Sequence, residues 1–467
     1  MDHFNTIRGN TMRGNRLQDE NRVKIRFNKG ILWAFVMILL LVCSTVNFFG
    51  IHPFRDSLEK KLLDEAESRI EIIRKGTTSL DFGVGNASAP VYIRQLSHDF
   101  RFGANCFQFG EFSTEYLNQL YNESFQSLFN YATLPFYWDM FEPTQGVYPY
   151  RYRMHNMTEW LETFNGTAKG HPIVWQSNYP PWLTEKDESE NETIVLNRIE
   201  YLLNEYPEIK VWDLVNEMIH VNNSWLGDTP VETWEVALEK ARSVRDDCEF
   251  IINEYDIIDS GNASKGFGPP KSYYDLIKQI IEDNYAPDAI GFQFHSTYKW
   301  QPLQDIVDTL DTFGDFKIPC QITEFIPASK GYYYGGSRRG VITEFKQAEY
   351  AKIIYKMLFS HPAINTITWW DFSDTENWGA WKADSGAYMM TQNGRLLPVY
   401  TTLYDLIHVE WNSTMETSLD ENGRLKFSGF YGNYTISIDG GDPISFNITD
   451  TRTAENKPWK TTDIELE

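Results

Sequence analysis

Cysteine is scarce in this chain, with four among 467 residues. Cys43 lies in an apolar segment, which leaves Cys106, Cys248 and Cys320, so at most one disulfide can form among these three. The sequence also lacks any spacing of His and Cys that is typical of a metal site. We therefore expect buried free thiols rather than a disulfide scaffold, and neither a metal nor an organic cofactor.

Positive charge is also in short supply. Lys and Arg number 42 against 65 Asp and Glu, which gives a formal net charge of −23. This balance argues against a nucleic-acid partner, because phosphate groups need a basic surface. It suits a soluble, acidic domain of the secreted type.

Internal repeats and low-complexity tracts are absent, whereas aromatic residues are plentiful. Phe, Trp and Tyr make up 15% of the chain, with 15 Trp and 26 Tyr. This content suits a cleft in which sugar rings stack on aromatic side chains, and a large aromatic core would explain it equally well.

Long apolar runs are limited to residues 31–43, and no charge falls between Gly30 and Phe54. About 20 such residues are enough to cross a bilayer. Residues 1–29 are rich in Arg and Lys, and basic flanks stay in the cytosol. The sequence thus predicts a basic cytosolic tail over 1–29 and a transmembrane signal anchor over 30–51, in a single-pass type II membrane protein.

The part after the anchor is expected in a lumen or outside the cell. Ten Asn-x-Ser/Thr sequons support this, because all of them follow the apolar run and none precedes it. They begin at Asn86, Asn122, Asn156, Asn165, Asn191, Asn222, Asn262, Asn412, Asn433 and Asn447. The alternative is a signal peptide cleaved near residues 42–44, which would give a secreted protein.

The rest of the chain divides into three parts. Residues 55–98 indicate an amphipathic helix followed by accessory strands over 78–98. Residues 99–410 alternate strands and helices, which is the pattern of a (β/α)8 TIM barrel. Residues 411–467 are β-like, and we expect them to pair with 78–98 into a small accessory β-sheet that either binds sugar or supports the barrel. The eight barrel strands are predicted at 100–106, 131–136, 171–175, 209–215, 249–254, 289–294, 318–324 and 365–370.

Two of these strands end in a glutamate. Residues 211–217 and 318–324 are apolar runs that close with Glu217 and Glu324. A strand that is apolar on both faces belongs to a covered parallel sheet, and carboxylates at the C-terminal ends of barrel strands lie where active sites lie. One carboxyl group held protonated and one ionised, in a single cleft, are the groups that cleave a glycosidic bond.

Polar and aromatic residues gather at other predicted strand ends. Asn216 precedes the first glutamate and suits a hydrogen bond to a sugar hydroxyl. His295 ends the sixth strand, beside the seventh, where it would orient Glu324. Trp175 and Trp370 end the third and eighth strands. Their clustering strengthens the prediction of a carbohydrate site.

Several of these runs, in this order, resemble glycoside hydrolase family 10, the retaining endo-β-1,4-xylanases, over roughly residues 85–410. The run WDLVNE is similar to the acid/base motif and implies that role for Glu217, and QITEF implies the nucleophile role for Glu324. The resemblance implies a retaining hydrolase of β-1,4-linked polysaccharide, xylan above all, that acts by double displacement. The alternatives are a transglycosylase that remodels β-glycans and a non-catalytic carbohydrate-binding barrel.

Further motifs carry the resemblance. GHPIVWQS, INEYD, GFQFHS and TWWDFSD are similar to family motifs at the third, fifth, sixth and eighth strands. They imply substrate-binding or supporting roles for Asn216, His295, His171, Trp175, Gln176, Asn253, Tyr255 and Trp370.

The chain departs from the family pattern at two places. Thr133, Leu134 and Tyr137 stand where the family carries Glu, Asn and Lys, and Gln176 stands where it has a second His. The resemblance therefore implies altered contacts with the sugar on the glycone side.

Overall fold

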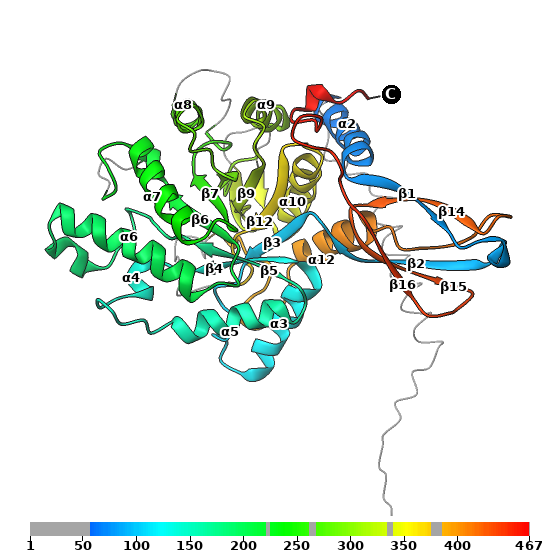
Figure 1. The fold of residues 1–467 in the computed structure, drawn as a ribbon, viewed down its shortest axis with the longest axis horizontal. Coiled ribbons are helices and arrows are strands. Elements are labelled where there is room, and N and C mark those ends of the chain that lie inside the picture. Colours follow the sequence, from blue (N-terminus) through cyan, green and yellow to red (C-terminus); the bar gives the residue numbers. More distant parts are fainter. Residues whose placement is uncertain (1–56, 221–224, 261–267, 334–339, 375–384, 467) are drawn as a thin grey trace, which may run out of the picture. The chain divides into compact units, whose positions relative to one another are not determined.

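The computed structural model describes residues 57–220, 225–260, 268–333, 340–374 and 385–466 (Figure 1). Eight parallel strands close into a barrel in the order β12-β3-β4-β5-β6-β7-β8-β9. The predicted (β/α)8 barrel is therefore confirmed. Its strands are β3 (Arg101–Asn105), β4 (Tyr131–Pro135), β5 (Thr167–His171), β6 (Val211–Asn216), β7 (Glu249–Glu254), β8 (Ala289–Phe292), β9 (Cys320–Phe325) and β12 (Ile364–Trp369).

The barrel strands are buried on both faces. Every residue of β6 and of β9 is buried, because one face fills the barrel interior and the other lies under helices. Tyr131, Val211 and Ile251 share one buried cluster. Packing is so close that a Cβ at Gly170 in β5 would lie 2.0 Å from the ring of Trp212.

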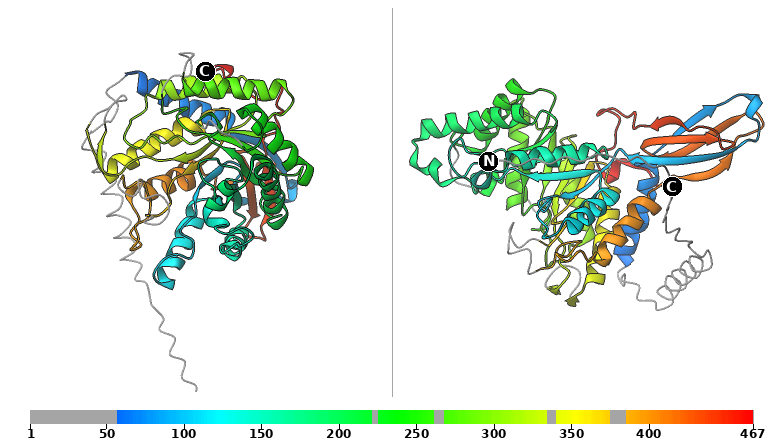
Figure 2. Two further views of the ribbon diagram at one scale, coloured as in Figure 1. Left: turned by 90° about the vertical axis from the view of Figure 1, so that its left-hand side faces the viewer. Right: turned by 90° about the horizontal axis from the view of Figure 1, so that it is seen from below.

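Helices lie around the outside of the strands (Figures 1 and 2). Several begin with a side-chain cap: Thr114, Thr229 and Thr343 each accept a hydrogen bond from the backbone N–H three residues on. The helices are α3 (Glu115–Leu128), α4 (Trp138–Phe141), α5 (Arg151–Glu162), α6 (Glu188–Glu205), α7 (Pro230–Val244), α8 (Pro269–Glu282), α9 (Leu303–Gly314), α10 (Glu344–Phe359) and α12 (Pro398–Asp405).

One strand differs from its predicted position. The third barrel strand is predicted at 171–175, but β5 ends at His171. The apolar residues that follow it form only an isolated bridge, between Val174 and Val215. The apolar run marks a buried segment after the strand, while the strand itself contains the charged Lys169 inside the barrel.

The two ends of the described chain build a β-sandwich beside the barrel (Figure 1). One sheet has the order β13-β2-β15-β16, and the other pairs β1 with β14. Val91, Phe427 and Ile436 lie in the apolar core of the sandwich. The predicted pairing of 78–98 with 411–467 is thus observed, while the predicted domain boundaries remain predictions. The elements are α2 (Ser57–Ile73), β1 (Lys75–Asp81), β2 (Pro90–His98), β13 (Met415–Ser418), β14 (Arg424–Phe430), β15 (Gly432–Ile438) and β16 (Ile444–Ile448).

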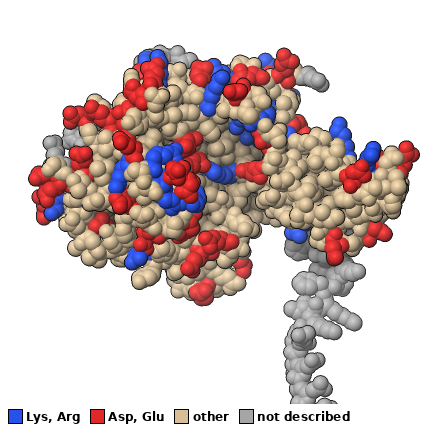
Figure 3. All heavy atoms as spheres, in the orientation of Figure 1, with Lys and Arg blue, Asp and Glu red and all other residues tan. Residues whose placement is uncertain are grey.

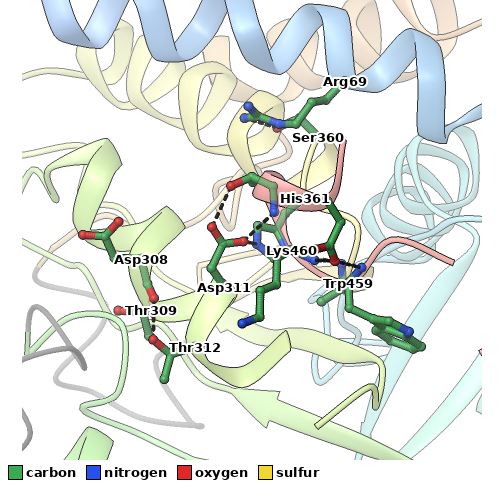
Figure 4. Close-up of polar contacts among 12 residues, drawn as sticks. Arg69, Asp308, Thr309, Asp311, Thr312, Ser360, His361, Trp459 and Lys460 are labelled. Atoms are coloured by element: carbon green, nitrogen blue, oxygen red, sulfur yellow. Dashed lines mark hydrogen bonds and ion pairs between the residues drawn. The ribbon is translucent and has the colours of Figure 1, made fainter. Parts of the chain in front are cut away.

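Polar contacts fasten these terminal segments to the barrel (Figure 4). Asp311 of α9 accepts hydrogen bonds from His361 Nε2 at 3.0 Å and from the backbone N–H and hydroxyl of Thr461, each at 2.6 Å. Arg74, just after α2, donates to the carbonyls of Phe359, His361 and Ile364 at 2.7–2.8 Å. These contacts lie at the N-terminal end of β12, so they brace the barrel and leave the C-terminal strand ends to the site.

The structure shows where the charged residues and the cysteines of this composition lie. On the face shown in Figure 3, acidic and basic side chains are interspersed. Cys106, Cys248 and Cys320 are all free and buried, as predicted.

The predicted anchor, residues 30–51, and the basic tail, 1–29, lie outside the described residues. Among the helices that the structure describes, none is long and apolar enough to cross a bilayer. Even α6, with 18 residues, carries glutamates and an arginine along its length. The prediction of a single-pass type II membrane protein with an anchor over 30–51 is contradicted, because no described helix could span a bilayer. Membrane attachment and glycosylation have no support in the described part of the chain.

Candidate active site

The two glutamates lie at the C-terminal ends of their strands and share neighbours. Glu217 directly follows β6, and Glu324 is the fifth residue of β9. Asn253 accepts a hydrogen bond from the Glu217 backbone N–H at 2.9 Å, and its side chain donates to Glu324 Oε1 at 3.3 Å. Gln293 does the converse: its side chain donates to Glu217 Oε1 at 2.8 Å, and its carbonyl accepts from the Glu324 N–H at 3.1 Å. The two carboxyl groups therefore converge on one site.

Glu217 has the surroundings of a proton donor. Burial is the largest cause that raises its pKa, and the negative charge of Glu324 adds to the effect. Hydrogen bonds from Gln293 and from Trp175 Nε1, both at 2.8 Å, oppose the rise but do not cancel it. Its φ of 61° lies in the left-handed region, where strained residues mark functional sites.

Glu324 has the surroundings of an ionised carboxylate. Its side chain is buried, and nitrogen atoms approach both of its oxygens. His295 Nε2 lies 2.9 Å from Oε2, while Asn253 Nδ2 and His171 Nε2 lie 3.3 and 3.9 Å from Oε1. Donors to a carboxylate stabilise its charged form. The two acids thus sit in different environments, as acid and nucleophile require.

A buried ion pair holds His171. Asp213 Oδ2 lies 2.7 Å from His171 Nδ1 and 2.8 Å from Lys169 Nζ, and both charged side chains are fully buried. With Nδ1 engaged in this way, the Nε2 edge of the imidazole faces Glu324. Asp213 therefore acts on the site through His171.

Asparagine side chains link the two catalytic strands. Asn253 Nδ2 donates to Asn216 Oδ1 at 2.9 Å, and Thr323 Oγ1 donates to Asn253 Oδ1 at 2.7 Å. Both asparagines are 1% exposed. This network ties β6, β7 and β9 together next to the carboxylates.

Aromatic rings wall the other side of the site. Tyr137 packs against His171 and Trp175, with ring centroids 5.7 Å apart in each pair. Trp370 is buried and meets His171 edge to face at 5.5 Å and Phe107 at 5.1 Å. Burial, followed by the charges of nearby carboxylates with Glu324 and Glu217 among them, raises the pKa of Tyr137 far above its ordinary value, so its hydroxyl stays neutral.

The remaining predicted positions lie close to these groups. Gln176 is buried directly after Trp175, and Tyr255 is half-buried directly after β7. Thr133 and Leu134, where the family carries polar sugar-binding residues, are fully buried in β4. In the described part of the chain, no group of three or more His, Cys, Asp and Glu could hold a metal ion.

Sequence reasoning missed several residues of the site. Gln293, Asp213, Glu254 and His220 were not selected, yet each contacts a predicted site residue or the turn that carries Glu217. A signal was present for Asp213, because a charged residue inside an apolar run such as 211–217 must be paired when the run is buried.

The family comparison agrees with this geometry. The model of glycosyl hydrolase family 10 matches residues 96–406. The chain belongs to glycosyl hydrolase family 10. The predicted resemblance and the prediction of an O-glycosyl hydrolase of the endo-xylanase type are thus confirmed.

Two endo-1,4-beta-xylanases are similar to this family-10 chain over aligned segments of different length. Endo-1,4-beta-xylanase B of Thermotoga neapolitana is 27% identical over 280 residues, which cover 58% of this chain and 78% of that protein. Endo-1,4-beta-xylanase 2 of Arabidopsis thaliana is 25% identical over 388 residues, 81% of this chain. The chain spans only about a third, 34%, of that plant protein.

Solved structures support the fold. Native xylanase 10B of Thermotoga maritima superposes with a TM-score of 0.55 at 22% identity, covering 67% of this chain and 96% of that one. Xylanase 10B of Thermotoga petrophila RKU-1, solved in complex with xylobiose, gives the same TM-score and identity.

Proposed function

We propose that this protein is a retaining hydrolase of β-1,4-linked polysaccharide, with xylan as its substrate. The convergence of Glu217 and Glu324 on shared neighbours, with different hydrogen-bond partners for each carboxyl group, carries the proposal. Relatives named endo-1,4-beta-xylanases support the choice of xylan. The altered residues at Thr133, Leu134 and Tyr137 point to a glycone side with fewer polar contacts.

In the first step, Glu324 attacks the anomeric carbon. Glu217, whose raised pKa favours its protonated form, donates a proton to the glycosidic oxygen as the bond breaks. The product is a glycosyl ester on Glu324 and a free leaving sugar. His295 and Asn253 hold the nucleophile in place.

In the second step, Glu217 is a carboxylate and acts as a base. It removes a proton from water, which attacks the anomeric carbon and releases the sugar from Glu324 with its original configuration. Trp370 would form the platform below the reacting sugar, with His171, Trp175 and Asn216 around it. Gln176, Asn253 and Tyr255 complete the proposed set of sugar-binding or supporting residues.

The test compares variants of the full chain on xylan. Glu324→Ala should abolish the release of reducing ends, and Glu217→Ala should lower it by about 100-fold or more. On 2,4-dinitrophenyl β-xylobioside, whose leaving group needs no proton, azide should recover the rate of Glu217→Ala and give a β-glycosyl azide, while Glu324→Ala with azide should give the α-anomer. Full activity in Glu324→Ala refutes the assignment, and Glu421→Ala, on the exposed β13–β14 turn, is the control.

The same assay separates the alternatives. A transglycosylase would redistribute the sizes of labelled oligosaccharides without net gain of reducing ends. A non-catalytic barrel would bind xylan, and its binding would survive in both glutamate variants with no turnover in any chain.

A further inference from the structure

Among the described residues, the backbone of the turn that carries Glu217 makes few hydrogen bonds. Glu217 leaves β6 and is followed by the short 3-10 turn Met218–His220. Its backbone is held by the 2.9 Å hydrogen bond from the Glu217 N–H to the Asn253 carbonyl and by a long one, 3.4 Å, from the His220 N–H to the Glu217 carbonyl. The position of the acid/base therefore depends on side chains that grip the turn.

Glu254, the last residue of β7, makes the side-chain contacts that hold this turn. Its side chain is 1% exposed, and both oxygens are engaged. Oε2 accepts the Ile219 N–H at 3.0 Å, and Oε1 accepts the Tyr255 N–H at 2.9 Å and lies 2.7 Å from His220 Nδ1. The carboxylate thus joins the turn after β6 to the end of β7. The double-displacement steps do not use this buried acid.

His220 is fixed from two sides. While Nδ1 meets Glu254, its ring lies flat on the ring of Tyr255, with centroids 3.8 Å apart and an interplanar angle of 17°. The His220 side chain keeps 21% of its surface exposed. These two contacts together restrict the orientation of the His220 ring at the end of the described turn.

His220 and Glu254 shift each other's pKa values, and Glu254 also affects the pKa of Glu217. Burial disfavours the protonated form of His220, but the hydrogen bond and charge of Glu254, with the charges of Asp256 and Glu217, outweigh it and raise the pKa of His220. Burial raises the pKa of Glu254, and its contact with His220 opposes that rise. Glu254, together with Glu324 from β9, also adds to the rise in the pKa of Glu217.

We propose that His220 and Glu254 are positioning residues that hold the Glu217 turn so that Glu217 delivers its proton to the leaving oxygen. The inference rests on the proposed retaining mechanism and deepens it. Neither residue would touch the reacting atoms. Their loss would impair proton delivery and leave nucleophilic attack by Glu324 intact.

The test compares two aryl xylobiosides that differ in whether their leaving group needs a proton from Glu217. The phenolate of phenyl β-xylobioside is a poor leaving group unless it is protonated. The 2,4-dinitrophenolate of 2,4-dinitrophenyl β-xylobioside departs without protonation. In the full chain, His220→Ala should lower kcat/KM on the phenyl substrate by up to about 100-fold, the cost of misplacing a catalytic group by about 1 Å. It should change kcat/KM on the dinitrophenyl substrate by less than about twofold. His220→Asn, whose amide nitrogen replaces Nδ1, should recover most of the loss.

Glu254→Gln adds an independent readout. It keeps the shape of the side chain but removes a negative charge near Glu217, so the basic limb of the pH profile on the phenyl substrate should move to lower pH. If His220→Ala does not fold, His220→Asn and Glu254→Gln carry the comparison. The matched control is His155→Ala, because His155 also pairs with a glutamate, Glu205, at 2.8 Å and packs on Tyr206, but on α5 and α6.

Equal losses on the two substrates, or no loss on the phenyl substrate, overturn the positioning role. A selective loss in the His155→Ala control would do the same, because it would show a general effect of removing a partly buried, paired histidine. A wild-type chain that cleaves neither substrate refutes the proposed function instead. The two failures are therefore distinguishable.

Discussion

Gln293 offers the sharpest test of how Glu217 is tuned. Gln293→Met keeps the length and volume of a side chain that is 1% exposed and removes the 2.8 Å hydrogen bond to Glu217 Oε1. That hydrogen bond stabilises the carboxylate and lowers the pKa of Glu217 against the larger effect of burial. Without it the carboxylate is less stable, so the pKa of Glu217 should rise further.

The size of the change follows from the lost bond. A hydrogen bond to a charged group is worth about 1.5–3 kcal/mol, and one pKa unit corresponds to about 1.4 kcal/mol. The basic limb of the kcat/KM profile, which reports the loss of the acid's proton, should therefore move up by about one pH unit or more. The second step should slow at pH values below the new pKa, where less of Glu217 is ionised and able to act as the base.

The assay is kcat/KM on an aryl xylobioside between about pH 4 and 9, with a folding check by circular dichroism. The matched control is Gln301→Met, since Gln301 is also fully buried but donates to the carbonyl of Asp259 at 2.7 Å. An unmoved basic limb, or one that moves down, would refute the assignment of Glu217 as the tuned acid.

Two further predictions concern stability. Asp213→Asn leaves Lys169 buried without its ion pair and should lower the free energy of unfolding, measured by urea denaturation, by about 3 kcal/mol. Adding Lys169→Met should recover much of this loss. No recovery in the double variant would contradict the ion-pair account. Arg74→Met removes three hydrogen bonds to barrel carbonyls and should cost about 1–3 kcal/mol. It should lower Tm while KM on xylan is unchanged, and a changed KM would show that the brace reaches the site.

How far the sequence predicts the site depends on how each residue is positioned. Glu217 and Glu324 end apolar strands, so the barrel rule alone brings them to one face. Gln293 and Glu254 also stand at strand ends. In the sequence, an amide or a second acid at such a position cannot be told from an ordinary solvent-exposed polar residue. Only the observed contacts across strands, such as the one from Gln293 to Glu217, give them a role.

The fold shows the same division between local and distant information. The strand–helix alternation predicts the barrel because each unit is local in sequence. The third strand was predicted too late in the sequence, because the apolar residues after His171 join β6 only as an isolated bridge. The strand itself contains the charged Lys169, which pairs with Asp213 of the next strand. Pairings of that kind are invisible in a single apolar run.

The β-sandwich can form only after the last strands of the chain have been synthesised. The ion pair between Asp81 of β1 and Arg424 of β14 joins residues 343 positions apart. At about 5–20 residues per second on the ribosome, the first strands wait on the order of 20–70 s for their partners. During that interval β2 has no partner on either edge, so the nascent chain offers chaperones a target until its last strands emerge.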